Sequence, residues 1–480
     1  MRPTMNDALK KASHDRIRAA LAEAQETAGL SRKLVSVRMS PGGYFAVAAV
    51  LTFASLILLR TQRDLAALIG IAFTWITVPL LIASNRLNFD GQRLWRSGPL
   101  VFLSRLLFRV RERLKIEEIE RVDVLSLRTL RRGGNVRYRY RVELSGAGQS
   151  FVFASGGRNF RRMIRDLFPR LPNSKLDARA RELRDHLVEN SVLNEEVERL
   201  RVASVSVLEA TSEGLRGKEQ RAGERHQAQD STEDVERAAQ LRKVGNDLRI
   251  AGRLRESAEA FRRALLASAQ DGSLIYEYSR LLRSQASTFG DARLLSRARA
   301  ALRLAIMRSD GDSSLLELIG ESFLEFGEPP RAARAFRSAL DLDDAAYRAR
   351  LGLAEVGLAE GKLAHVIHHY NEAVRIAPDK ATKRLALREA DYYARLNDDD
   401  DYLTAELRRM NWLDGAERVQ RLAARITFVA LLIALVGPSI DSVVAGLGWA
   451  FASSSIVAWA SALIIKRLLT PRRRVAVSDF

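Results

Sequence analysis

Hydrophobic positions gather near the two ends of this chain, and charged positions dominate the sequence between them. Near the N-terminus, residues 44–59 and 65–84 carry no charge and are separated by a short polar segment that contains Arg60 and Asp64. About 20 apolar helical residues cross the hydrocarbon core of a bilayer. The second stretch is long enough, and the long side chain of Arg60 can extend the first by reaching the interface. The pattern predicts a transmembrane hairpin within residues 41–84.

A second pair of apolar stretches, residues 426–436 and 443–465, lies near the C-terminus. Gly437 and Pro438 separate the two stretches and favour a turn. We therefore expect a second transmembrane hairpin within residues 418–466. Because the first stretch of this pair is short, the pattern also allows one spanning helix preceded by a helix that lies in the interface.

Basic residues indicate how these hairpins are oriented. Lys and Arg precede the first apolar stretch, follow the second and flank the last hairpin, whereas the turn at 437–442 has none. The turn at 60–64 has two arginines, against this trend. Because Lys and Arg are enriched in cytoplasmic flanks, we expect a multi-pass protein of a bacterial inner membrane with both termini and most of the chain in the cytoplasm. The ends would be a basic helical segment (1–40) and a basic tail (467–480).

Short strand patterns fill residues 85–172, which we call the β module. Asp90-Gly91 is a favourable hairpin turn, residues 136–144 alternate between polar and apolar, and residues 159–171 have an amphipathic helical pattern. Two membrane helices, an Asn-Arg-Leu-x-Phe-x-Gly hairpin, an Ile-x-x-Ile-x-x-Val-x-Val segment, further strands and a final helix resemble the bacterial PH-like membrane proteins. The resemblance implies a small curved sheet or barrel capped by one helix, and no shared catalytic activity.

The formal net charge of +19 indicates an anionic partner. Strongly basic proteins usually meet nucleic acid or an anionic membrane surface. Tyr138 and Tyr140 alternate with arginines but fall on the apolar side of their strand, so we expect them in the core and expect no nucleic-acid partner. The arginines form either a surface that contacts anionic lipid or a solvated face. The candidate anionic-lipid surface consists of Arg131, Arg132, Arg137, Arg139, Arg141, Arg158, Arg161 and Arg162.

Residues 236–380 repeat with a period of 34. Gly327 and Gly361 are 34 positions apart, as are Phe336 and Tyr370. An earlier copy is displaced by a further seven positions, which indicates an insertion around residues 284–295. The period and its small and aromatic positions resemble the tetratricopeptide (TPR) repeat family. The resemblance implies stacked helix pairs with a concave groove that binds a protein or peptide.

The first helix of each repeat is expected to line this groove. We expect residues 173–235 to form a charged helical and flexible linker before the repeats, and residues 381–417 to form capping helices after them. The candidate groove residues, chosen by their position within the repeat, are Arg242, Asn246, Arg249, Arg280, Arg283, Glu317, Glu321 and Arg350.

The absence of cysteine excludes disulfides, thiolate zinc sites and cysteine nucleophiles. His365, His368 and His369 have the helical spacing of metal ligands, but a partly exposed polar face is the favoured interpretation, and no catalytic, cofactor or metal site is predicted. The sequence predicts a multidomain α+β membrane protein with two transmembrane helical hairpins, a PH-like β module and an α-helical TPR solenoid. We expect a membrane-anchored scaffold or adaptor and not an enzyme. The alternative is a lipid-responsive sensor or a membrane-complex assembly factor, and the pattern indicates no oligomeric state.

Overall fold

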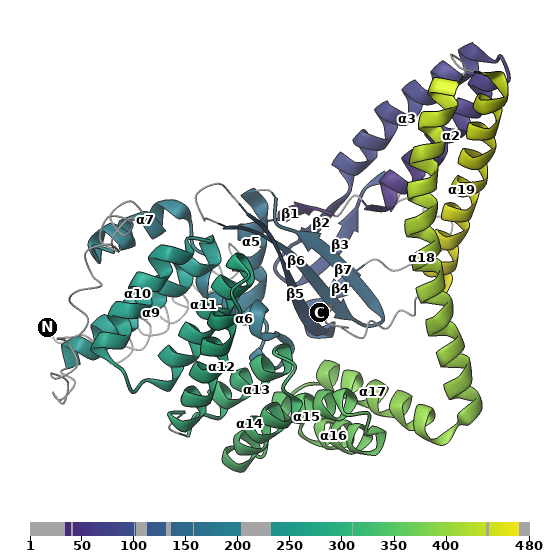
Figure 1. Ribbon diagram of the computed structural model, residues 1–480. Coiled ribbons are helices and arrows are strands. Elements are labelled where there is room, and N and C mark those ends of the chain that lie inside the picture. The colour runs from purple at the N-terminus through teal and green to yellow at the C-terminus, as the bar shows by residue number, and fades with distance from the viewer. Residues whose placement is uncertain are drawn as a thin grey trace, which may run out of the picture.

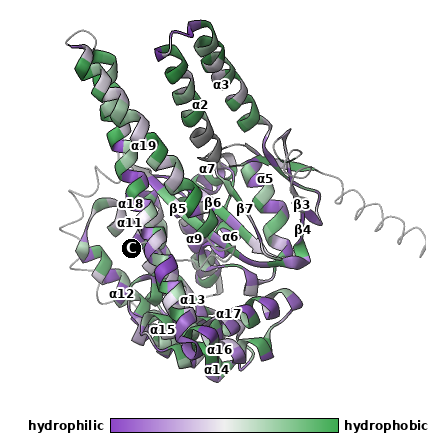
Figure 2. Cartoon of the chain, turned by 90° about the vertical axis from the view of Figure 1, so that its right-hand side faces the viewer, coloured by the Kyte–Doolittle hydropathy of each residue, from purple (hydrophilic) through white to green (hydrophobic). Residues whose placement is uncertain are grey.

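The computed structural model describes residues 34–39, 42–99, 101, 113–130, 136–156, 158–202, 232–309, 311–437 and 441–469. These residues form a β module, a curved helical array and two helical hairpins (Figure 1). The β module lies between the array and the hairpins, and Figures 1 and 2 agree on this arrangement.

The two hairpins project from the same side of the molecule. The first consists of α2 (Gly42–Arg60) and α3 (Asp64–Ser84), and the second of α18 (Asp400–Val436) and α19 (Ser442–Leu469). Both turn at the end that lies farthest from the array. In Figure 2, green marks much of α3 and α19 as apolar, whereas the part of α18 near the array is largely purple and white. By length and composition α3, α18 and α19 could cross a membrane, whereas the apolar part of α2 is shorter.

α18 changes the expected boundary between the array and the last hairpin. The sequence assigned residues 381–417 to capping helices and residues 418–466 to the hairpin, but α18 runs without a break from Asp400 to Val436. The apolar stretch 426–436 is the end of this helix and pairs with α19, where the hydroxyls of Thr427 and Ser455 are 2.8 Å apart. The capping element of the array is a separate helix, α17 (Lys380–Asp398).

Two antiparallel sheets build the β module, in the orders β1-β2-β3-β4 and β5-β6-β7. The predicted turn at Asp90-Gly91 is confirmed, because Phe89 pairs with Leu94 across it and Gly91 has a φ of 93°. The strands are β1 (Val35–Arg38), β2 (Arg86–Phe89), β3 (Arg93–Ser97), β4 (Arg113–Lys115), β5 (Ile119–Leu130), β6 (Val136–Gly146) and β7 (Gln149–Ala154), with 3-10 turns at η1 (Ile116–Glu118), η2 (Phe168–Arg170) and η3 (Asn173–Lys175).

Strand β1 corrects the prediction that residues 1–40 are helical. Val35–Arg38 pair with β2 in antiparallel register, and Val35 and Val37 are buried. The remaining residues of the predicted helical segment lie outside the described part, apart from Leu34 and Met39. A strand of four residues offers too short an alternation to be recognised, and its partner strand follows two intervening helices.

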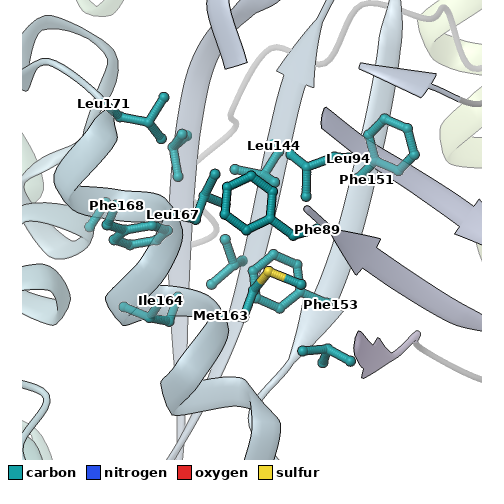
Figure 3. Close-up of a cluster of buried hydrophobic side chains, with 14 of the residues drawn as sticks. Phe89, Leu94, Leu144, Phe151, Phe153, Met163, Ile164, Leu167, Phe168 and Leu171 are labelled. Carbon is teal, nitrogen blue, oxygen red and sulfur yellow. The ribbon is translucent and has the colours of Figure 1, made fainter. Parts of the chain in front are cut away.

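The closing helix of the β module, α5 (Arg158–Leu167), has the predicted buried face. Met163, Ile164 and Leu167 of α5 pack against Phe89 and Phe153 in one hydrophobic cluster (Figure 3). Full burial of a side chain of this size contributes about 1.5–3 kcal/mol. Because the same cluster includes residues of both sheets, the sheets and α5 form a single core.

Helix pairs form the array over the predicted repeats. Gly320 allows close approach within one pair, because a Cβ there would lie 2.5 Å from the ring of Phe336. The predicted insertion falls at α11, which has 18 residues where α13 has 13. The pairs are α9 (Thr232–Ala251) with α10 (Leu254–Ala267), α11 (Gly272–Phe289) with α12 (Ala292–Met307), α13 (Ser313–Glu325) with α14 (Pro329–Leu342), and α15 (Tyr347–Ala359) with α16 (Leu363–Ile376).

Candidate functional site

The predicted linker supplies a helix that lies against candidate groove residues of the array. Its described part forms α6 (Ala178–His186) and α7 (Asn190–Arg199), whereas residues 203–231 lie outside the described part. α7 packs on α9 through the buried side chains of Leu193 and Val197. α6 lies against the first helices of the repeats through the ion pairs described below. The described part of the predicted linker is therefore helical, as expected, but it is packed on the array, which the sequence did not indicate.

Glu182 is the centre of the contact between α6 and the array. Its carboxylate lies 2.9 Å from a guanidinium nitrogen of Arg280 and 3.2 Å from one of Arg249. Burial would raise the pKa of Glu182, but Arg249 and Arg280, with help from His186 and Arg179, lower it below its usual range. Glu182 is therefore ionised, and one acid of α6 neutralises two buried arginines of the groove.

Arginines of α6 complete the match with acids of α13. Arg179 lies 3.4 Å from Glu325, and Arg181 lies 3.7 Å from Glu317. Glu325 also contacts Arg283, which belongs to the groove. The helix thus presents both charge signs, and each meets the opposite sign on the array. A partly buried charge that loses its partner strongly destabilises the fold. Because a shift of α6 along the array would separate these ion pairs, the charges favour the observed position of α6.

The β module extends this contact towards both ends of the array. At α9, the hydroxyl of Tyr140 donates to the carbonyl of Ile250 at 3.1 Å, and the amide of Val136 donates to the carbonyl of Gly252 at 3.1 Å. Gly252 has a φ of 84°, and a Cβ there would collide with the carbonyl oxygen of Val136. At α17, Arg388 lies 3.1 Å from the buried Glu120 of β5. The array therefore wraps around the module.

The structure brings part of the predicted groove set together around α6. Arg249, Arg280 and Glu317 pair with α6 directly, and Arg283 meets it through Glu325. The other predicted residues lie elsewhere: Arg242 pairs with Asp271 at 3.1 Å, Asn246 donates to Glu277 at 2.6 Å, Glu321 accepts from Arg348 at 2.6 Å, and the Nε of Arg350 is buried without a hydrogen-bond partner.

Glu182, Arg179 and Arg181 are functional candidates that the sequence analysis missed. The available signal was an N-cap, because the side chain of Asp177 accepts from the amide of Ala180 at the start of α6. An aspartate followed by a short run of alternating charge predicts an exposed helix, and nothing local indicates that its charges have buried partners.

The predicted anionic-lipid surface is divided between two elements. Arg137, Arg139 and Arg141 are exposed on one side of β6, whereas Arg161 and Arg162 lie on α5. Arg131, Arg132 and the side chain of Arg158 lie outside the described part. The expected position of the tyrosines is confirmed, because Tyr138 and Tyr140 stack at a ring separation of 6.1 Å and pack against hydrophobic clusters.

The histidines of α16 show no metal-binding geometry. Among the described residues, no group of three or more His, Asp or Glu side chains is placed to hold a metal ion. The rings of His368 and His369 are 5.1 Å apart. Burial, together with His368 and Arg350, lowers the pKa of His369 to about 4, so His369 is neutral at pH 7.

The array defines the chain as a protein with a TPR-like helical repeat fold. No family model matches the sequence, and no curated protein matches it. Solved structures that resemble it include YrrB, a TPR protein with an unusual peptide-binding site (16% identity, 44% of this chain and 92% of that chain, TM-score 0.27). Others are MamA (14%, 35% and 85%, 0.24) and a tetratricopeptide repeat protein from Parabacteroides merdae (15%, 58% and 99%, 0.28). Because these scores are low, the assignment rests on the helix pairs themselves.

Proposed function

We propose that this protein is a scaffold anchored in a bacterial inner membrane, whose TPR-like array binds a protein partner at the cytoplasmic face. The observation that carries the proposal is the seating of α6, with Glu182 between Arg249 and Arg280. A groove that holds one charged helix of its own chain is suited to a helix of the same charge pattern from a partner. The partner would compete with α6, and the function would be binding and not catalysis.

Exposed apolar side chains support the anchoring. Phe73 and Trp75 on α3, and Phe428 and Phe451 on the other hairpin, are more than half exposed. Contiguous exposed apolar surface of this kind is rare on soluble monomers. Only Asn85 separates α3 from β2, so the β module, which resembles PH-like modules, would sit at the base of the hairpin. Both hairpins turn at the same end, as a topology with cytoplasmic termini requires.

A photo-crosslinking experiment tests the groove. A photoreactive amino acid replaces Arg283, and Glu182→Arg places a third positive charge beside Arg249 and Arg280. With native Glu182, crosslinks should join position 283 to α6 of the same chain. In E182R they should shift to a separate protein, and the charge swap E182R/R280E should restore the internal crosslink. Loss of the internal crosslink without any crosslinked protein would contradict partner binding in this groove.

Topology is tested separately with reporter fusions at the turns 60–64 and 437–442. Both should report the periplasmic side, and full-length protein should resist extraction by alkaline carbonate. A cytoplasmic signal at either turn would overturn the two-hairpin arrangement without affecting the result of the crosslinking experiment.

A further inference from the structure

One face of the β5–β6 ribbon leaves two leucines uncovered. Leu125 is 53% exposed and Leu127 is 63% exposed, although both lie within a regular strand. Leu125 pairs across the strands with Arg141, and Leu127 with Arg139. Both arginines are exposed. Since directly opposed residues of an antiparallel pair lie on the same face, the two leucines and two arginines form one patch, which we call the Leu–Arg face.

The opposite face of the ribbon fixes this orientation. Val124 and Val142 are buried in the core of the β module, and the hydroxyl of Tyr140 bonds to Ile250 of α9. Successive side chains of a strand point to opposite faces, so a shift that buried Leu125 would expose Val124. The leucines therefore stay outside because the other face is held by both the core and the array.

The chemistry of the Leu–Arg face matches that of an anionic bilayer surface. Apolar side chains can enter the boundary between headgroups and acyl chains, while guanidinium groups pair with lipid phosphates. The β module also lies next to the bilayer if α3 spans it. α3 ends at Ser84 and β2 begins at Arg86, so Asn85 is the sole residue between them. An acidic protein surface would satisfy the arginines but would give no role to two uncovered leucines on a module that is joined directly to an apolar helix.

We propose that the Leu–Arg face rests on the anionic lipid surface of the membrane that holds the chain, with Leu125 and Leu127 in the headgroup region and Arg139 and Arg141 on lipid phosphates. This inference rests on the proposed membrane anchoring. Compared with the anionic-lipid surface predicted from the sequence, it includes Leu125 and Leu127, which the sequence did not single out. It places the arginines of β6, and not those of α5, in contact with lipid. Each arginine near an anionic leaflet should strengthen the contact about fivefold, and salt should weaken it.

The absence of cysteine allows a direct measurement on the full-length chain. Leu127→Cys carries a fluorophore, and the protein is placed in nanodiscs of phosphatidylcholine with or without phosphatidylglycerol. Nitroxide groups on the lipids then quench probes that lie at the bilayer. Phe73→Cys on α3 reports insertion of the hairpin, and Met307→Cys, exposed at the end of α12, reports an array surface.

The probe at 127 should be quenched in anionic nanodiscs, at least several-fold more than the probe at 307, and R139Q/R141Q should remove most of that difference. Equal quenching at 127 and 307, or equal quenching at 127 in neutral and anionic nanodiscs, would overturn the inference. Protection of the probe at 127 from a water-soluble quencher without lipid quenching would assign the face to a protein and also overturn it. If the probe at 73 is not quenched, the proposed membrane anchoring is contradicted. If the probe at 73 is quenched and the probe at 127 is not, the anchoring stands and only the lipid contact of the Leu–Arg face is contradicted.

Discussion

Lys175, in the 3-10 turn η3 that directly follows the β module, forms a salt bridge of 2.9 Å with Asp379 at the start of α17. The side chain of Lys175 is 3% exposed, so this charge is buried where the module meets the end of the array. Asp379 also accepts from the backbone amides of Ala381 and Thr382, which makes it the N-cap of α17. A single carboxylate thus begins the capping helix and fastens it to the β module.

Removal of this bond should lower stability. Lys175→Met keeps the apolar stem but deprives Asp379 of its charged partner, and because Asp379 is 33% exposed we expect a loss of only about 1–2 kcal/mol. Thermal unfolding of full-length protein in detergent measures the loss. The matched control is Arg375→Met, which breaks an i,i+3 pair with Glu372 whose arginine is 76% exposed and should cost less than about 0.5 kcal/mol. Equal losses of stability in the two variants would contradict a stabilising role of the buried Lys175–Asp379 salt bridge.

The close approach of helices within a repeat gives a second prediction. Gly320→Ala places a Cβ 2.5 Å from the ring of Phe336, so the pair must separate, at a cost of about 1–3 kcal/mol. Gly415→Ala on α18 serves as the control, because no atom lies within 4 Å of its added Cβ and alanine favours a helix. Denaturant titration should show destabilisation for G320A and no loss for G415A, and the reverse order would refute the packing.

Asp177 should make stability depend on pH. Burial and the neighbouring Asp123 raise the pKa of Asp177 to about 7 from its ordinary value of 3.8. The folded chain then holds this proton more tightly than the unfolded chain, so the stability that the group contributes is complete below about pH 4 and is lost as the pH rises to 7.

Asp177→Asn tests this dependence. The amide cannot accept from both Val124 and Ala180, so the variant should be less stable at every pH, yet its stability should change less between pH 4 and 7. Denaturant titrations across this range supply the slope. Asp185→Asn, at an exposed position of α6, should keep the native slope, and an unchanged slope in D177N would exclude Asp177 as its source.

The C-terminal hairpin should depend on small residues. A Cβ at Gly448 would lie 2.5 Å from the backbone nitrogen of Ala434, so α18 and α19 pack closely there, as small residues permit in apolar helix pairs. In this cysteine-free chain, T427C/S455C should form a disulfide on mild oxidation, and adding G448V should reduce its yield several-fold. T427C/S454C is the control, because Ser454 is exposed. Equal yields for the two pairs would contradict the interface.

Elements with strong local patterns were predictable from the sequence. The hairpin at Asp90-Gly91, the alternation in β6 and the buried face of α5 each follow from a few neighbouring residues, and the structure confirms them. The repeats were predictable because a 34-residue period repeats the same small and aromatic positions. The insertion was also located, since it displaced that period at α11.

The contact between α6 and the candidate groove residues could not be predicted in the same way. Glu182 meets Arg249 and Arg280 from a distant part of the chain, and α6 alone has the composition of an exposed helix. β1 likewise pairs with a strand that follows a complete hairpin. In both cases the deciding energy comes from partners that local sequence does not reveal, namely buried ion pairs and a sheet edge.

The unbroken course of α18 has a mechanical consequence. Its 37 residues correspond to a rod of about 55 Å, and no proline interrupts it between Asp400 and Val436. The same rod begins beside the capping helix of the array and ends at the tip of the apolar hairpin. A load on the repeats is therefore delivered to the hairpin as leverage, by tilting or twisting α18 against α19, because α18 itself runs from the array into the hairpin without a break.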